Sequence, residues 1–372
     1  MRIALLGTRG IPANYGGFET FAEELSVRLV ARGHEVFVYC RETPVARDAS
    51  RRQTKHDLPK YRGVDLRRLP TIRHKYFDTL AHTFLSTLHL LTHRVDAALY
   101  CNAANAVFTI LPRLAGIPVA LNVDGIERRR KKWNALARAW YRVSEFLATI
   151  LPNRVVTDAR EIERYYLATW RKTSVFIPYG ADSVREDSQG ALQALGLEPH
   201  RYFLYVSRME PENRALEVRL AFEQVPANLK LALVGDAPYA DEYIRQVRDT
   251  HDPRVVIPGA IYGLGYRELG TWCFAYVHAT EVGGTHPALI EAMGRGALVL
   301  YLDTVENREV CADAGLPYTD QAGLTARMRE ALAMSEAERE RYRALALERV
   351  RQRYNWDAVT TQYENLLLGL RK

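Results

Sequence analysis

Short runs of aliphatic, β-branched and aromatic residues alternate along the chain with longer segments in which apolar residues recur every three or four positions. Runs of the first kind predict buried strands, and segments of the second kind predict helices. In the first half, the strands expected are 2–6, 35–40, 64–69, 97–100, 118–122, 154–157 and 174–177, and the helices are 19–32, 76–92, 133–151 and 159–169. In the second half, the strands expected are 202–206, 230–234, 255–257, 275–277 and 298–301.

This alternation is typical of parallel sheets whose strands are joined by crossover helices, so we expect an α/β fold. A chain of 372 residues exceeds the usual size of one domain, and the pattern restarts after a stretch that contains Gly, Asp and Ser. We predict two Rossmann-like, doubly wound domains facing a cleft, with an N-terminal domain at 1–180, a linker at 181–195 and a C-terminal domain at 196–352. Ligands of such sheets bind beyond the carboxyl ends of the strands.

The composition is that of a globular protein, with 48% hydrophobic and 26% charged residues, which excludes a disordered or fibrous chain. No apolar run reaches about 18 residues, so no transmembrane helix is expected. The N-terminal apolar run lacks a cleavage site of small residues, and we interpret it as the first strand and not as a signal peptide. Widely spaced cysteines indicate reduced thiols and a cytoplasmic protein; they are Cys40, Cys101, Cys273 and Cys311.

The net charge of +7 is unevenly divided along the chain. Residues 1–175 contain 29 Lys and Arg against 16 Asp and Glu, a net charge of +13. Residues 176–372 contain 22 Lys and Arg against 28 Asp and Glu, a net charge of −6. The basic half is expected to face an anionic partner, which is a phosphate-bearing substrate, a membrane surface or nucleic acid.

A glycine-rich loop follows the first strand and leads into a helix, with the sequence GTRGIPANYGGFETFAEEL. Gly7 and Gly10 permit a tight turn, and Gly16 and Gly17 bring backbone N–H groups to the helix start, where an anion can bind. The loop fits neither common nucleotide motif, because the glycine spacing is not G-x-G-x-x-G and the Walker A lysine is absent. A plain strand-to-helix turn is the alternative interpretation.

Loops in the second half of the chain also place candidate ligand-binding residues at strand ends. The segment SRMEPEN puts Arg208 directly after a strand, where a guanidinium can neutralise a diphosphate leaving group. The segment VIPGAIYG supplies the backbone of Ile261 and Tyr262, which is suited to contacting a nucleobase.

A third loop, EVGGTHPALIEAMG, combines a Gly-Gly turn with the start of a helix expected over 285–293. The N–H groups of Gly284, Thr285 and His286 would lie at the start of this helix and suit a pyrophosphate. Glu291 lies further along the helix and can accept hydrogen bonds from both hydroxyls of a ribose.

These segments, together with NVDGIERRRKKW, resemble the retaining GT-B-fold glycosyltransferases of family 4. The resemblance extends from Gly7 to Gly294 and is closest to the subgroup that contains bacterial rhamnosyltransferases of cell-surface polysaccharide assembly. It implies that the C-terminal segment 353–372 is a helix that returns to pack on the first domain.

The resemblance also assigns roles to single residues. Glu291 matches the second glutamate of the family's paired-Glu motif, which holds the nucleotide ribose. Arg208 matches the arginine of the R-x-x-x-E-K segment, which contacts the diphosphate. Gly17 matches a loop glycine whose backbone approaches the phosphates and the donor sugar. Because no D-x-D motif is present, no metal and no other cofactor is expected.

The chain departs from the family's pattern at three positions. Asn213 replaces the usual lysine, so the diphosphate site has lost a charge that Arg214 or a reshaped loop can compensate. Nine residues separate Glu281 from Glu291 where the family has seven, which leaves open whether Glu281 reaches the donor sugar. Asp124 stands where many members have histidine, and it either orients the acceptor hydroxyl and accepts its proton or stabilises its own turn.

A basic arm follows Asp124 and precedes a helix that has tryptophans on one face. This pattern favours a membrane-surface or acceptor contact, with a solvated basic rim or a nucleic-acid contact as the alternatives. The residues concerned are Arg128, Arg129, Arg130, Lys131, Lys132 and Trp133. In the preceding helix, 76–92, we expect ordinary amphipathic packing and no metal site from its histidines.

The sequence thus predicts a cytoplasmic glycosyltransferase that is peripheral at the inner face of the cell membrane. By subgroup likeness the first expected donor is dTDP-L-rhamnose, with a UDP- or GDP-linked hexose as the alternative. The expected acceptor is a glycan or a polyprenyl-diphosphate-linked sugar, and nucleic acid is not expected as a partner. A nucleotide-sugar epimerase and a catalytically inactive binding protein remain as rival classes.

Overall fold

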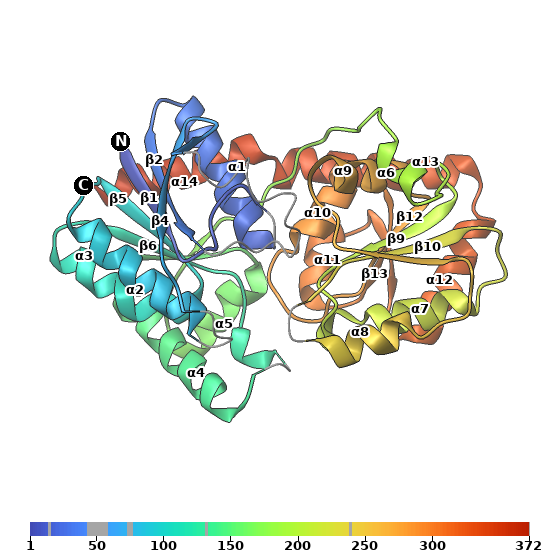
Figure 1. Ribbon diagram of the computed structural model, residues 1–372, viewed down its shortest axis with the longest axis horizontal. Coiled ribbons are helices and arrows are strands. Elements are labelled where there is room, and N and C mark those ends of the chain that lie inside the picture. The colour runs from blue at the N-terminus through green and yellow to red at the C-terminus, as the bar shows by residue number, and fades with distance from the viewer. Residues whose placement is uncertain (14–15, 43–58, 73–76, 131–132, 238–239, 372) are drawn as a thin grey trace. The chain divides into compact units, whose positions relative to one another are not determined.

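A computed structural model describes residues 1–13, 16–42, 59–72, 77–130, 133–237 and 240–371. The chain forms two compact units (Figure 1). Unit 1 contains residues 1–179 and 356–372, and unit 2 contains residues 180–355. Within the described residues no helix is both long and apolar enough to cross a membrane.

Unit 1 is built on a sheet with the strand order β3-β4-β2-β1-β5-β6-β7-β8, in which every pairing is parallel except that of β3 with β4. Its strands are β1 (Arg2–Leu6), β2 (Glu35–Arg41), β3 (Lys60–Tyr61), β4 (Val64–Leu69), β5 (Ala97–Cys101), β6 (Val119–Val123), β7 (Arg154–Thr157) and β8 (Val175–Phe176). Its helices are α1 (Gly17–Ala31), α2 (Asp78–Leu91), η2 (Ala103–Thr109), α3 (Ile110–Leu114), η3 (Glu127–Arg129), α4 (Ala135–Ile150), α5 (Arg160–Trp170) and α14 (Trp356–Leu370).

The C-terminal helix α14 packs on unit 1, as expected. The Tyr363 ring lies 5.1 Å from that of Phe21 on α1, and the Tyr363 hydroxyl accepts a hydrogen bond from Nδ2 of Asn122 at 2.9 Å. Glu364 accepts hydrogen bonds from Arg32 and pairs with His34 at 2.7 Å. Helices cover both faces of the sheet (Figure 1), and most residues of its central strands are therefore buried and apolar, with Asn122 on β6 as a buried polar exception.

Unit 2 has a wholly parallel sheet with the order β11-β10-β9-β12-β13-β14. Its strands are β9 (Tyr202–Val206), β10 (Lys230–Val234), β11 (Val255–Gly259), β12 (Ala275–His278), β13 (Leu298–Leu302) and β14 (Gly315–Tyr318). Its helices are α6 (Gly190–Ala194), η4 (Pro211–Asn213), α7 (Ala215–Glu223), α8 (Asp241–Arg248), α9 (Gly263–Trp272), α10 (Pro287–Gly294), α11 (Val305–Cys311), α12 (Gln321–Ala333), α13 (Glu336–Arg349) and η5 (Val350–Tyr354).

Several expectations from the sequence differ from the structure in detail. The strands β3 and β14 were not expected, and β14 contains Gly and Pro, which obscure a strand pattern. The expected linker 181–195 is packed on unit 2, where Ala191 N donates to Glu268 Oε2 at 2.7 Å. Helix α10 starts at Pro287, since proline is favoured in the first helical turn.

The expectation that the helix at 76–92 packs as an ordinary amphipathic helix, with its apolar face inward, is wrong for α2. Its buried residues are mostly polar, whereas Phe84, Leu88 and Leu91 are exposed to solvent. The orientation of a helix depends on what it packs against, and the sequence pattern alone does not show which face is turned inward.

Candidate functional site

The carboxyl edge of the unit 2 sheet contains a topological switch point. The chain runs from β9 to β10 on one side of β9, whereas β12 lies on its other side. Open α/β sheets bind ligands at such a point, just beyond the carboxyl ends of the two central strands. Arg208 follows β9 by two residues and Glu281 follows β12 by three, so both expected site residues lie on loops that leave the switch point.

Asn213 shapes the loop that carries Arg208. Its side chain is buried and donates to the carbonyl of Arg208 at 2.7 Å, while its own carbonyl accepts the Tyr205 hydroxyl at 2.8 Å. The Arg208 guanidinium is partly exposed and lies 3.6 Å from the carboxylate of Glu210. Asn213, at the position of the family's lysine, therefore fixes the conformation of the loop that carries Arg208.

Glu281 is held by Arg214, a pairing that the sequence did not indicate. Arg214 Nε donates to Glu281 Oε1 at 2.7 Å, and its Nη2 contacts the same oxygen. Arg214 Nη1 also donates to Glu217 at 3.1 Å. The backbone N–H of Glu281 donates to the carbonyl of Glu212 at 2.9 Å, so the loops after β9 and β12 are tied together by backbone and side chain.

His286 occupies the N-cap position of α10, and its side chain belongs to a polar network with the buried His278 and Asn307. Its Nδ1 lies 2.8 Å from Asn307 Oδ1 and 3.1 Å from His278 Nε2. Asn307 Nδ2 donates to the carbonyls of Thr280 and Leu302 at 3.1 and 2.9 Å, which turns the amide oxygen toward His286. Burial, followed by the neighbouring His286, holds the pKa of His278 well below its usual range.

The same histidine packs against Gly283, which is separated from Glu291 by seven residues, the spacing of the family's paired glutamates. A Cβ atom on Gly283 would lie 2.3 Å from Nε2 of His286, so any larger residue there would require the imidazole to shift. The turn thereby places Gly284 and Thr285, both buried, directly before the start of α10. Sequence reasoning missed His278 and Asn307; for His278, its position at the end of a strand was the available signal.

Glu291 lies in the second turn of α10 and faces α9. Its carboxylate is 3.7 Å from Nη2 of Arg295, whose guanidinium lies over the Tyr266 ring at 4.6 Å. Burial, followed by the charge of Glu291, raises the pKa of Tyr266. The carboxylate is therefore anchored at one side by a cation and a phenol.

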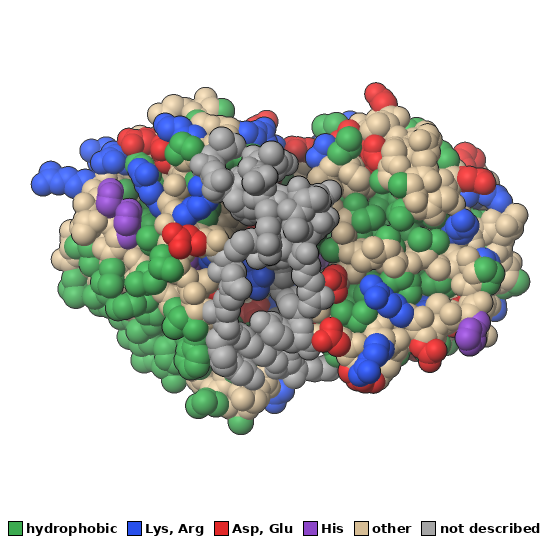
Figure 2. Space-filling model, viewed as in Figure 1, with side chains coloured by type: hydrophobic (Ala, Val, Ile, Leu, Met, Phe, Trp, Pro, Cys, Tyr) green, Lys and Arg blue, Asp and Glu red, His purple; other side chains and the backbone are tan. Residues whose placement is uncertain are grey.

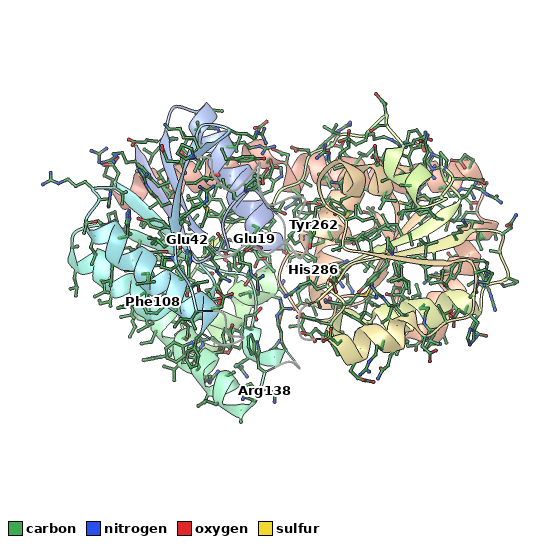
Figure 3. The ribbon with its side chains drawn as sticks, in the orientation of Figure 1. Glu19, Glu42, Phe108, Arg138, Tyr262 and His286 are labelled. Carbon is green, nitrogen blue, oxygen red and sulfur yellow. The ribbon has the colours of Figure 1, made fainter. Side chains whose placement is uncertain are left out.

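Two further loops reach the same edge of the sheet. Tyr262 precedes α9 with 49% of its surface exposed, and Ile261 packs against the start of this helix. Gly235 follows β10, and a Cβ atom there would lie 1.8 Å from the carbonyl oxygen of Ser207. Tyr262 and His286 lie at the same end of unit 2 (Figure 3).

In unit 1 the glycine-rich loop leaves the switch point between β1 and β5. Gly7 has φ +90°, and a Cβ atom on it would lie 2.3 Å from the carbonyl oxygen of Cys101 at the end of β5. Gly16 caps α1 without a side-chain bond, and Gly17 is its first residue. The side chain of Glu19 lies against this start and accepts the N–H of Arg9 at 2.9 Å.

Glu19 was missed by the sequence analysis, although Gly16-x-x-Glu19 has the spacing of a capping box. Its side chain is buried, and Glu23 fixes the same loop by accepting the N–H of Ala13 at 2.6 Å. The start of α1 therefore already carries a carboxylate, and an incoming phosphate would lie next to it.

Asp124 follows β6 in unit 1 and is half-buried. Asp124 and Asp158, which follows β7, both lie close enough to Tyr179, which follows β8, to act on its pKa. Burial, followed by the charges of Asp124 and Asp158, holds the pKa of Tyr179 well above its usual range. The carboxyl ends of adjacent strands thus bring two carboxylates that lie 34 positions apart in the sequence near the same tyrosine.

The basic arm is largely held by ion pairs within unit 1. Arg128 donates to Glu145 at 3.3 Å and to the Tyr165 hydroxyl at 2.9 Å. Glu127 accepts hydrogen bonds from Arg130 at 2.6 Å and from Trp133 at 3.4 Å. Arg129 is exposed, and Lys131 and Lys132 lie outside the described residues.

Comparison with solved structures identifies the fold. Sucrose-phosphate synthase from Thermosynechococcus elongatus superposes with a TM-score of 0.81 at 20% identity, over 99% of this chain and 98% of that one. HepE from Anabaena, solved with UDP-glucose, superposes with a TM-score of 0.77 at 17% identity, over 99% of this chain and 100% of HepE. WaaG, a glycosyltransferase involved in lipopolysaccharide biosynthesis, superposes with a TM-score of 0.71 at 16% identity, over 99% of this chain and 100% of WaaG.

The chain has the GT-B fold. The expected α/β architecture of two parallel-sheet domains is thereby confirmed. A family model described as a domain of unknown function (DUF1972) matches residues 1–182, which correspond to unit 1 without its C-terminal helix and to the first residues of unit 2. No curated protein matches the chain at a significant level.

Proposed function

We propose that this chain is a retaining glycosyltransferase that binds a nucleotide-sugar donor on unit 2. The observation that carries the proposal is the set of groups on the loops around the switch point between β9 and β12. These groups are Arg208, Glu281 with its partner Arg214, and the loop that leads to His286. The solved structures of the same fold include HepE with UDP-glucose, which supports a nucleotide-sugar donor.

In this proposal Arg208 and the backbone N–H groups of Gly284, Thr285 and His286 stabilise the negative charge that develops on the departing diphosphate. Glu291 receives the ribose hydroxyls, and the backbone of Ile261 and Tyr262 contacts the base. Glu281 is already engaged by Arg214, so we assign it to positioning that guanidinium near the donor.

The reaction breaks the bond between the anomeric carbon and the diphosphate oxygen and forms a bond to an acceptor oxygen on the same face. Because the new bond forms on the face that the diphosphate leaves, the sugar keeps its configuration. The acceptor proton passes to the leaving diphosphate, so no external acid is consumed. In unit 1, Asp124 orients the acceptor hydroxyl, and Gly16 and Gly17 approach the donor. No divalent metal is needed in this scheme.

The donor proposed first is dTDP-L-rhamnose, with a UDP- or GDP-linked hexose as the alternative. The acceptor is a glycan or a polyprenyl-diphosphate-linked sugar of bacterial surface polysaccharide synthesis, on the cytoplasmic side of the membrane. WaaG, with the same fold, takes part in lipopolysaccharide biosynthesis, which supports this setting. Residues 128–133 would contact the acceptor or the lipid head groups.

The first test is thermal stabilisation of the purified protein by dTDP-, UDP- and GDP-sugars in the presence of EDTA. One donor should raise the melting temperature more than the others, and adding Mg²⁺ should change nothing. No shift with any donor would contradict the proposed site. Consumption of the nucleotide sugar without an acceptor, giving an isomeric nucleotide sugar, would identify an epimerase instead.

A further inference from the structure

Two neighbouring helices of unit 1 have their polar residues inside and their apolar residues outside. The inward residues of α2 include His82, Thr83, Ser86 and Thr87, and those of α4 include Tyr141, Ser144, Glu145 and Thr149. The outward apolar residues are Phe77, Phe84, Leu88 and Leu91 at α2, and Leu136, Val143, Phe146 and Ile150 on α4. The outward residues of each set recur at helical spacing over 77–91 and 136–150, so each set forms one continuous stripe.

The two stripes belong to one surface. The Phe84 ring lies 5.9 Å from that of Phe108, at the end of η2 next to α3. Arg113 on α3 donates to the carbonyls of Ile150 and Leu151 at 3.0 Å, which ties α3 to the end of α4. Leu114, 78% exposed, lies on α3 beside this junction. Figure 2 shows hydrophobic side chains gathered over α2, α3 and α4; we call this surface the apolar face.

Two of the inward polar side chains, Thr87 and Glu145, make hydrogen bonds that stabilise this orientation. Thr87 Oγ1 donates to the carbonyl of Thr83 at 2.7 Å and lies 2.9 Å from the Tyr100 hydroxyl on β5. Glu145 accepts the Tyr165 hydroxyl at 2.6 Å. A surface helix in water normally turns its apolar stripe to the core, and large exposed apolar areas mark interaction sites. The apolar face therefore requires a partner that is itself apolar.

The charges around the apolar face favour one kind of partner. The two acidic residues of α2, α3 and α4 are both in ion pairs, Asp78 with Arg41 and Glu145 with Arg128. Cations border the same helices, including exposed Arg138 on α4 and Arg94 just after α2. A second copy of the chain would bring like charges together across such an interface, whereas an anionic lipid surface complements them.

We propose that the apolar face docks on an anionic lipid bilayer, with α2 and α4 lying in the plane of the interface. The outward side chains enter the boundary between head groups and acyl chains, and the bordering arginines contact the lipid phosphates. This proposal goes beyond the transferase reaction, because lipid binding by this face requires no donor and no acceptor. It also adds a lipid contact at a surface other than the basic arm, residues 128–133.

The test is co-sedimentation of the full chain with sucrose-loaded vesicles, either of phosphatidylcholine alone or with phosphatidylglycerol added. The triple variant L114Q/L136Q/V143Q removes exposed apolar groups without changing charge. The double variant V184Q/L368Q makes the same change at exposed positions on unit 2 and on α14 and serves as the control. The double variant R94Q/R138Q tests how much the positive charges contribute to vesicle binding. Far-ultraviolet melting curves establish that each variant is folded.

The wild-type chain and the control should bind vesicles that contain phosphatidylglycerol. The triple variant should bind at least about tenfold more weakly, and each removed arginine should weaken binding by about fivefold. Wild-type protein that stays in the supernatant, or a folded triple variant that binds like wild type, would overturn the proposal. A dimer in solution that the triple variant abolishes would identify the face as a contact between copies and would also overturn it. Thermal stabilisation by nucleotide sugars, measured without lipid, separates a failure of this proposal from a failure of the proposed reaction.

Discussion

The buried amide of Asn307 offers a quantitative test of the network that orients His286. Replacing Asn307 with leucine keeps the approximate volume but removes the two hydrogen bonds to the carbonyls of Thr280 and Leu302 and the one to His286. All three contacts are withdrawn from water, since Asn307 is fully buried. Each net contribution is about 1 kcal/mol, so the free energy of unfolding of unit 2 should fall by about 3 kcal/mol.

For a unit of this size, 1 kcal/mol corresponds to about 2–4 °C, so the melting temperature of the N307L variant should drop by about 6–12 °C. The assay is differential scanning calorimetry, in which the unfolding of unit 2 is followed with and without the donor identified by the thermal-shift panel. Replacing the exposed Asn228 with leucine is the matched control and should shift the melting temperature by about 2 °C or less.

Donor binding gives the second readout. If Asn307 orients His286 beside the pyrophosphate, the N307L variant should bind the donor about tenfold more weakly at a temperature where it is fully folded. A drop in melting temperature below about 2 °C would refute the hydrogen-bond reasoning. A large drop with unchanged donor affinity would show that the network supports the fold and does not position the ligand.

Further predictions concern the loops of unit 2 and one histidine of unit 1. R208A should lower kcat by roughly 10²-fold, and turnover at the wild-type rate would remove Arg208 from leaving-group stabilisation. E291A should weaken donor binding measured by calorimetry about tenfold, and unchanged affinity would place the ribose elsewhere. G235A should destabilise unit 2 by more than about 1 kcal/mol in urea unfolding, because its Cβ would overlap the carbonyl of Ser207. Burial, followed by the charge of Arg41, lowers the pKa of His82 from 6.5 to about 4. The unfolded chain therefore binds more protons than the folded chain below pH 6.5, and the free energy of unfolding falls as the pH falls toward 4. Wild type should therefore lose about 2 kcal/mol more than H82L between pH 7 and pH 5 in urea unfolding, and equal losses would contradict the prediction.

The strand and helix pattern made most of the fold predictable. Buried parallel strands are apolar along their length, so β1, β9 and β10 have the boundaries expected from the sequence. The exceptions have a local cause: β3 is only two residues long, and β14 contains Gly and Pro. Such short or interrupted segments gain their strand conformation from neighbours that the local sequence does not reveal.

The candidate site was predictable where residues lie at strand ends or follow glycines, as for Arg208 and the turn before His286. It was not predictable where side chains from distant segments meet. Arg214 and Glu281 are 67 positions apart in the sequence, and two nitrogens of the Arg214 guanidinium contact the same carboxylate oxygen of Glu281. Asn307 reaches His286 from a different helix, 21 positions away.

The sequence by itself determined the α/β class, the two parallel sheets and the loops that carry the candidate chemistry, because hydrophobic periodicity and glycine placement act locally. Only the tertiary structure decided which charges are neutralised and which helix faces point outward. Arg128 is engaged by buried Glu145, and α2 and α4 turn their apolar stripes to solvent. Both outcomes depend on neighbours that the folded chain brings together, since the orientation of a helix and the pairing of a charge are properties of its surroundings and not of its own sequence.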